Sequence, residues 1–184
     1  GRRDLRRRAA AFGRTQIVTT PAPRLARPED ADAVTALLQR SYGKLFNDFY
    51  DAPTLGVALP VMARANPELL ASDGWFVVEE NGALIGCGGW TPEEPETGAV
   101  KPGQAHARHF ATDPAHLRRG IGRAIWDASV AQARAQGVTR MVVYSSLPAE
   151  SFYTALGFRP LRQRFTTLRD GVRFASVEME AKIG

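Results

Sequence analysis

The amino-acid sequence predicts a mixed α/β fold with one central sheet. Apolar residues between Ala33 and Tyr42 recur at helical spacing, whereas from Trp75 onward they form short strand-like runs. Gly137 and Gly157 follow two later helical segments that alternate with strands, and glycine is typical of helix ends. The order of elements indicates a mixed sheet whose central strands are joined by a helical crossover.

The first part of the predicted domain is mostly helical. Residues 24–27 are a short strand candidate. Pro28, Glu29 and Asp30 then suit a helix start, where proline fits the first turn and acids favour the positive end of the helix dipole. That helix continues to about Tyr42, and we expect two more helices at residues 54–65 and 67–71.

Strands dominate the rest of the chain. Asn81-Gly82 favours a tight turn between strands 75–79 and 83–90, because both residues tolerate positive φ angles. A loop rich in Pro, Glu and Gly follows at 91–103. The remaining expected elements are the strand 104–112, the helix 120–136, the strand 140–145, the helix 148–156 and a hairpin of strands 158–168 and 172–182.

The composition excludes several classes of protein. The 184 residues, 44% of them hydrophobic, suit one globular domain, which we place at 21–184 after a basic arm at 1–20. One cysteine excludes an internal disulfide and Cys-rich zinc modules, and the three histidines lack a ligand spacing, so we expect no metal site. No apolar run approaches the roughly 18 residues of a membrane span. We therefore expect a cytoplasmic protein without a membrane partner.

The formal net charge of +5 is unevenly placed. The arm holds six arginines and one acid, so the rest of the chain carries 18 basic and 18 acidic residues. A neutral body argues against nucleic acid as the main partner. We expect the arm to be disordered, with a role in nucleic-acid binding, membrane binding or targeting as the alternative.

The most informative segment is Arg118-Arg119-Gly120-Ile121-Gly122-Arg123, which opens the helix 120–136. Exposed N–H groups at a helix start, glycines that allow close approach and guanidinium groups together suit phosphate. A Walker loop is excluded because no Gly-Lys-Ser/Thr ending exists, and a dinucleotide fingerprint because Ile125 stands where its third glycine belongs. For this motif alone, glycines used only for tight packing remain an alternative.

A second segment makes the pair of motifs specific. Residues 149–158 read Ala-x-x-Phe-Tyr-x-x-x-Gly-Phe and follow the glycine loop after one helix and one strand. With the Gly-Cys-Gly-Gly-Trp run at 86–90 and the Asp170-Gly171 hairpin, residues 24–182 resemble the GNAT-type N-acetyltransferase superfamily. The resemblance implies a GNAT-like acyl-CoA N-acyltransferase fold, in which the parallel strands 104–112 and 140–145 splay apart.

The resemblance also implies which residues bind acetyl-CoA as cosubstrate. Backbone amides of the loop would hold the pyrophosphate, and the main chain of residues 110–112 would pair with the pantetheine arm. The family's Gln/Arg is Leu117 here and its frequent Asn is Ser146, so two side-chain contributions differ. The expected cofactor-binding residues are Phe110, Ala111, Thr112, Leu117, Arg118, Arg119, Gly120, Ile121, Gly122, Arg123, Ser146, Ala149 and Phe152.

Tyr153 matches the family's tyrosine, and the resemblance makes it the general acid. Its phenol would donate a proton to the thiolate that leaves when an amine attacks the thioester. Histidine titrates near neutrality, and some members of the family carry a histidine in a position like that of His106. For the base we therefore favour His106, with His109, a glutamate or water left open. Strand alternation places His106 and His109 on opposite faces unless a bulge intervenes. Cys87, in its glycine-rich strand, is expected to be a small buried residue.

These residues predict an N-acetyltransferase that transfers the acetyl group of acetyl-CoA to a primary amine, by direct attack and for a small-molecule acceptor. The aromatic residues Tyr42, Phe46, Phe49 and Tyr50 either wall the acceptor pocket or pack in the core. The alternatives are a non-catalytic acetyl-CoA sensor, a protein or peptide N-acetyltransferase, and transfer of another acyl group. A homodimer is expected by analogy with relatives alone.

Overall fold

A computed structural model describes residues 19–184. The sequence-based expectation for the basic arm therefore falls almost entirely outside the described residues. Thr20, just before the first strand, is partly buried, and its Oγ1 donates a hydrogen bond of 2.5 Å to the carbonyl oxygen of Arg119. This contact places the start of the domain beside the glycine loop at 117–122.

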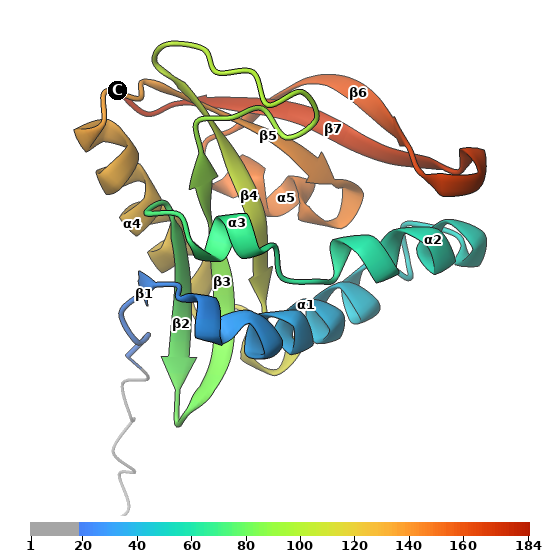
Figure 1. Cartoon of the computed structure of the whole chain (residues 1–184), viewed down its shortest axis with the longest axis horizontal. Coiled ribbons are helices and arrows are strands. Elements are labelled where there is room, and N and C mark those ends of the chain that lie inside the picture. The colour runs from blue at the N-terminus through green and yellow to red at the C-terminus, as the bar shows by residue number, and fades with distance from the viewer. Residues whose placement is uncertain (1–18) are drawn as a thin grey trace, which may run out of the picture.

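Seven strands form one sheet in the order β1-β2-β3-β4-β5-β7-β6 (Figure 1). Every neighbouring pair is antiparallel except β4 and β5, which run parallel and are joined by a helical crossover. The predicted mixed α/β fold with a helical crossover is therefore confirmed. The strands are β1 (Arg24–Leu25), β2 (Trp75–Glu80), β3 (Ala83–Thr91), β4 (Gln104–Thr112), β5 (Arg140–Ser146), β6 (Arg159–Thr167) and β7 (Arg173–Lys182).

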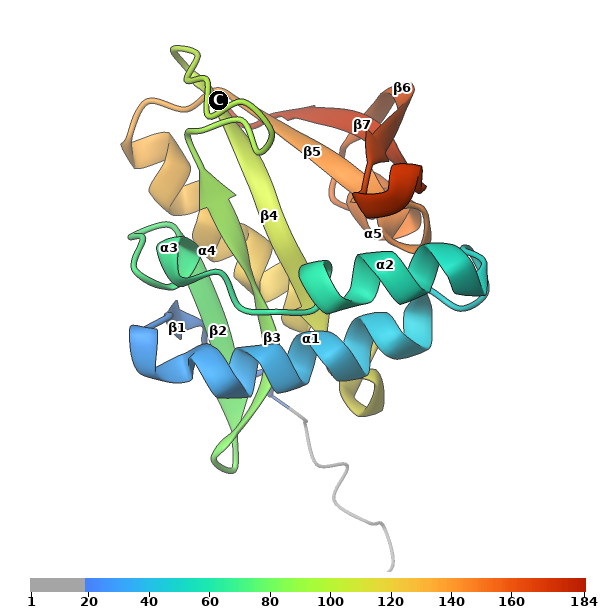
Figure 2. The ribbon, with the colours of Figure 1, turned by 45° about the vertical axis from the view of Figure 1, so that its right-hand side comes forward.

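Helices cover both faces of the sheet (Figures 1 and 2). On one face lie α1 (Ala31–Leu45), α2 (Ala52–Met62) and α3 (Pro67–Leu70), in a core that includes Val34, Val77 and Cys87. α1 contacts β3 and β4, whereas α2 contacts α1 and β7. On the other face lie α4 (Ile121–Ala135) and α5 (Glu150–Ala155). Their cores include Ile121 and Ile125, packed on β2 and β3, and the aromatic rings of α4 and α5.

The helices near the N-terminus differ slightly from the prediction, for local reasons. The turn Pro28–Asp30 is a 3-10 helix, and α1 then continues to Leu45 rather than ending at Tyr42. α2 begins earlier than expected because the Asp51 side chain accepts a hydrogen bond of 2.9 Å from the Thr54 amide and caps the helix. It also ends earlier, at Met62, two residues after Pro60.

The strands β4 and β5 separate soon after they meet, which is the feature that positions the site. Only three residue pairs connect them, from Gln104 with Arg140 to His106 with Val142. Beyond these pairs the two strands diverge, as Figure 2 shows. β5 instead pairs along its whole length with β7. The backbone groups of β4 that face β5 after His106 therefore have no partner strand.

None of the helices in residues 19–184 has the length and apolar character needed to cross a membrane. The same residues contain no cluster of three or more His, Cys, Asp or Glu side chains placed to hold a metal ion.

Candidate active site

A β-bulge in β4 sets the direction of the side chains where β4 leaves β5. Gly89 pairs with Arg108 and Cys87 with Ala111, so His109 and Phe110 together oppose the single residue Gly88. His109 has a φ of +50°, which a non-glycine residue adopts rarely. A Cβ at position 88 would lie 2.7 Å from the Phe110 ring, so only glycine allows this ring to pack there.

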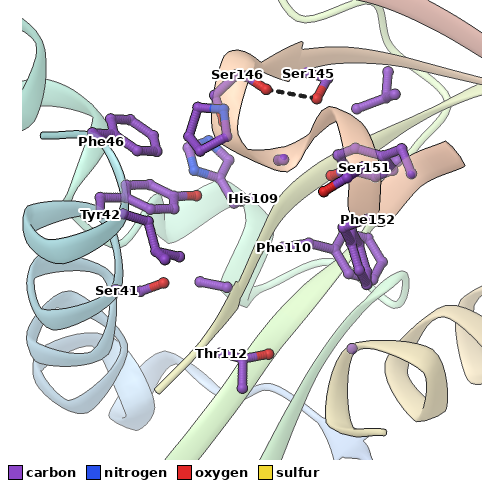
Figure 3. Close-up of a pocket in the computed structure, with 18 of the residues that line it drawn as sticks. Ser41, Tyr42, Phe46, His109, Phe110, Thr112, Ser145, Ser146, Ser151 and Phe152 are labelled. Atoms are coloured by element: carbon purple, nitrogen blue, oxygen red, sulfur yellow. Dashed lines mark hydrogen bonds between the residues drawn. The ribbon is translucent and has the colours of Figure 1, made fainter. Parts of the chain in front are cut away.

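A cavity of about 770 Å³ opens between the separated strands, a volume typical of small-molecule sites. Figure 3 shows its middle, where Tyr42 and Phe46 from α1 lie near His109 while Phe110 and Phe152 lie on the other side. Its wall contains most of the residues that the sequence singled out. These are Phe110, Ala111, Thr112, Leu117, Arg118, Gly122, Ser146, Ala149, Phe152 and Tyr153.

Gly122 is required by packing at the start of α4. A Cβ there would lie 2.7 Å from Cε2 of Phe152, so the helix start and α5 approach each other at this glycine. Gly120, which immediately precedes α4, has a φ of +77°, in the left-handed region that favours glycine. The loop thus leaves the first amides of α4 without a side chain above them, an arrangement suited to an anionic group.

Four of the expected loop residues do not line the cavity with their side chains. Arg119 forms a two-point ion pair with Glu80, at 2.6 and 3.0 Å, which turns its guanidinium toward the β2–β3 hairpin. Arg123 donates a 2.8 Å hydrogen bond to the Ala155 carbonyl. Ile121 is buried in the core, and Gly120 has no side chain. Of the three arginines in this segment, Arg118 lines the cavity, whereas Arg119 and Arg123 do not.

Tyr153 lies at the centre of the aromatic group between α4, α5 and β4. It is 4% exposed, and its ring packs edge-on against those of Phe110 and Phe158 at centroid distances of 6.1 and 5.3 Å. Burial raises the pKa of Tyr153 above its usual range, so the phenol stays protonated at neutral pH. The side chain therefore offers a proton donor on the cavity wall.

The two histidines of β4 have different surroundings. His106 is 2% exposed and does not line the cavity; it sits edge-on to the Tyr144 ring and its Nδ1 has no partner among the described residues. His109 lines the cavity because the bulge turns it there. Burial, and then the neighbouring charge of Arg108, lower the pKa of His109 to about 4, which keeps its imidazole neutral. The structure therefore does not bring His106 to the cavity, and it does bring His109.

The other end of the cavity is formed by side chains that are far apart in the sequence. Of the four aromatic residues at 42–50, Tyr42 and Phe46 line it, whereas Phe49 and Tyr50 do not. Sequence reasoning missed the rest of this wall, because no local sequence pattern joins its residues. The missed residues include Ser41, Leu45, Met62, Pro95, Arg108 and Tyr144.

Tyr50 serves the scaffold instead. Its hydroxyl donates a 2.8 Å hydrogen bond to the Ala175 carbonyl and accepts one of 2.8 Å from the Leu147 amide. It thereby joins the turn after α1 to β7 and to the residue that follows β5. Cys87, fully buried, has a thiol pKa raised by burial to about 12, which makes it chemically inert.

Known proteins resemble this chain in sequence pattern and in fold. The family model of the "Acetyltransferase (GNAT) family" matches residues 32–158. No curated protein matches the chain significantly.

Solved structures share the fold over nearly the whole length. A GCN5-related N-acetyltransferase from Rhodopseudomonas palustris has a TM-score of 0.70 at 21% identity, over 89% of this chain and 96% of that one. The PaiA N-acetyltransferase from Thermoplasma acidophilum, in complex with coenzyme A, has a TM-score of 0.64 at 14% identity, over 87% and 97%. A GNAT family acetyltransferase from Brucella melitensis, in complex with acetyl-CoA, has a TM-score of 0.56 at 20% identity, over 88% and 87%.

The family match covers more than half of the chain, and it includes both the glycine loop and the tyrosine that line the cavity. The chain therefore belongs to the GNAT family, the N-acetyltransferases that take their acetyl group from acetyl-CoA.

Proposed function

We propose that this protein transfers the acetyl group of acetyl-CoA to the primary amine of a small molecule, by direct attack of the amine on the thioester. The observation that carries the proposal is the cavity between the diverging strands β4 and β5, with the glycine loop at one end and aromatic side chains at the other. Its volume of about 770 Å³ is sufficient for a pantetheine arm together with a small acceptor.

The residues present fit the donor. The backbone of residues 110–112 is unpaired on the side that faces β5, so it can hydrogen-bond the amides of a pantetheine arm, as an added strand would. The first amides of α4 and the Arg118 guanidinium can hold the pyrophosphate, and the backbone of Arg119, Gly120, Ile121 and Arg123 belongs to the same anion-binding loop. Ser146, Ala149 and Phe152 would border the arm from the β5–α5 side.

In the proposed mechanism Tyr153 is the general acid. The attacking nitrogen forms a bond to the acetyl carbon, the carbon–sulfur bond breaks, and Tyr153 donates its proton toward the leaving sulfur. Its raised pKa keeps the donor protonated before the reaction, and it also favours rapid return of a proton to the phenoxide. The proton lost by the nitrogen balances the one delivered to sulfur, so no further reactant is needed.

For the proton acceptor the proposal favours His109 over His106. A base must reach the reacting nitrogen directly or through one water, and His109 lines the cavity while His106 does not. Because its pKa is about 4, His109 is neutral at pH 7 and can accept a proton. It then releases that proton to solvent rather than remaining protonated. The bond to carbon makes the nitrogen far more acidic than a free ammonium group, so a weak base suffices.

The donor site is tested by thermal unfolding with acetyl-CoA, CoA, NAD and ATP at matched concentrations. A ligand at about 100 times its dissociation constant stabilises by about 2.7 kcal/mol, which raises the midpoint by several degrees. We expect a shift with acetyl-CoA and CoA only. No shift with either compound would remove the proposed function.

The acid role is tested with Tyr153→Phe, which keeps the ring and removes the proton. We expect kcat to fall by about 100-fold or more while the dissociation constant of acetyl-CoA changes less than threefold. Tyr144→Phe is the matched control, since that tyrosine also lines the cavity but lies on β5, away from the Tyr153 group. Equal losses of turnover and acetyl-CoA affinity in Tyr153→Phe would contradict the assignment.

A small acceptor and a cytoplasmic location complete the proposal. The acceptor end is bordered by α1, α2 and the loop at Pro95, and these walls favour a compact molecule over an extended polypeptide. The single cysteine is buried and unpaired, as suits a reducing compartment. Acetylation of a denatured protein or peptide mixture in preference to small amines would argue against this acceptor class.

A further inference from the structure

The acceptor end of the cavity carries an arginine without an acidic partner. Arg108 lies on β4 just before the bulge, is partly buried and lines the cavity. Its Nη1 donates a 3.1 Å hydrogen bond to Oγ1 of Thr91, which is a neutral group. No carboxylate of residues 19–184 forms an ion pair with it. The other guanidinium N–H groups are not sealed from solvent, so they are available to a ligand.

This arginine differs from Arg119 and Arg164, two other arginines near the site. Arg119 is paired with Glu80, and Arg164, which covers the Tyr144 ring at 3.9 Å, is paired with Glu96 and Glu178. Their charges are therefore already matched within the protein. Arg108 instead has a pKa lowered by burial, although the more distant Glu93, Glu94 and Glu68 favour its charged form. A partly buried cation without a direct partner gains most from an anion supplied by a ligand.

The charges on the cavity wall also favour a ligand with an anionic group. None of the residues that line the cavity is an aspartate or a glutamate, and its charged members are Arg108 and Arg118. Arg118 belongs to the donor loop, where it would meet phosphate. At the acceptor end the apolar side chains of Tyr42, Phe46 and Met62 surround the remaining space. A polyamine would place a second positive charge against this wall without a carboxylate to receive it.

We propose that the acceptor is an amine that also carries a carboxylate, such as a free amino acid, and that Arg108 binds this carboxylate. The inference rests on the proposed N-acetyltransferase function and names the substrate class of the same cavity. The planar guanidinium suits two-point binding of a carboxylate, which fixes the orientation of the acceptor as well as its position. The amine is then held at a set distance from the bound group, on the side of the bulge where His109 lies.

The test compares matched pairs of acceptors. The twenty standard α-amino acids, β-alanine and γ-aminobutyrate are each assayed beside the corresponding carboxamide, with spermidine as a cationic acceptor. Release of CoA gives turnover, and thermal unfolding of the CoA-bound protein gives binding. We expect at least one carboxylated amine to exceed its carboxamide about 10- to 100-fold in kcat/KM, the effect of a charge-assisted hydrogen-bonded pair.

Variants connect this preference to Arg108. Arg108→Gln should reduce the ratio of carboxylate to carboxamide to about one, and Arg108→Lys should retain part of it, while acetyl-CoA affinity stays within about twofold in both. Arg118→Gln is the matched control: it should weaken acetyl-CoA binding and leave the ratio unchanged. Unchanged CoA affinity also shows that the Arg108 variants are folded.

Three results would overturn the inference. The first is a preference for carboxamides or spermidine. A spermidine preference that disappears in Glu93→Gln would assign the selectivity to that carboxylate instead of Arg108. The second is a carboxylate preference that persists in Arg108→Gln. The third is a panel in which no carboxylated amine is acetylated or bound. In each case binding of acetyl-CoA would leave the proposed function standing, whereas failure to bind acetyl-CoA or CoA would remove that function first.

Discussion

The two ends of the cavity are built in different ways. The donor end consists mainly of backbone: the edge of β4 that faces β5 and the loop before α4, in which Gly120 has a positive φ and Gly122 approaches Phe152 closely. The acceptor end consists of side chains brought from α1, α2, the loop at Pro95, β4 and β5. A backbone site accepts a common ligand in many sequences, whereas a side-chain site changes its ligand when a few residues change.

This difference explains how far the sequence could be interpreted. The glycine loop and the Phe-Tyr segment are contiguous motifs, so their meeting at one cavity could be predicted, as could the mixed sheet and its crossover. Arg108 and Met62 follow no local pattern, because what joins them is tertiary packing. The bulge was not predicted either, since it depends on Gly88 leaving room for the Phe110 ring, and it decides that His109 rather than His106 lines the cavity.

The largest effect is expected on acetyl-CoA affinity, from a substitution that disrupts the donor end and leaves the acceptor end intact. Gly122→Trp would put a large side chain where even a Cβ would lie only 2.7 Å from Phe152. We expect the dissociation constant of acetyl-CoA, measured by calorimetry, to rise at least 100-fold. The control is Gly56→Trp on α2, where a Cβ has open space, and it should bind as the parent does. Unaltered affinity in Gly122→Trp would place the donor elsewhere.

An intermediate effect is expected on the pH dependence of stability, through the buried His109. The folded-state pKa of His109 is about 4 against an ordinary 6.5, so the unfolded chain binds the extra proton between these values. Stability is therefore complete above about pH 6.5 and lost as pH falls toward 4. From pH 7 to pH 5 the loss is about 2 kcal/mol, and burial of His106 lowers its pKa and adds in the same direction.

The measurement is chemical unfolding of the parent and of His109→Gln at pH 7 and pH 5. We expect the variant to lose less stability on acidification than the parent does. Equal losses would show that His109 titrates normally, and its proposed role as a neutral proton acceptor would then lose its support.

The smallest effect concerns the link between the two ends. Tyr50→Phe removes the hydroxyl that bridges the Leu147 amide and the Ala175 carbonyl. We expect a loss of about 1–2 kcal/mol, seen as a fall of the unfolding midpoint by a few degrees, with acetyl-CoA affinity nearly unchanged. Phe49→Leu, at an exposed ring of the same turn, is the control and should change the midpoint little. Stability equal to the parent in Tyr50→Phe would mean that water replaces the bridge.

The chain of aromatic rings from Tyr42 to Phe174 constrains how this protein can acquire new acceptors. Tyr42 stacks on Phe46 at 4.8 Å, Phe46 contacts Tyr50, and Tyr50 stacks on Phe174 of β7 at 4.5 Å. A substitution in α1 that reshapes the acceptor end therefore also moves the support of the segment that carries Tyr153. Met62 and Pro95 border the same space without belonging to that stack. Diversification of acceptor choice, in nature or in the laboratory, should begin at those two positions.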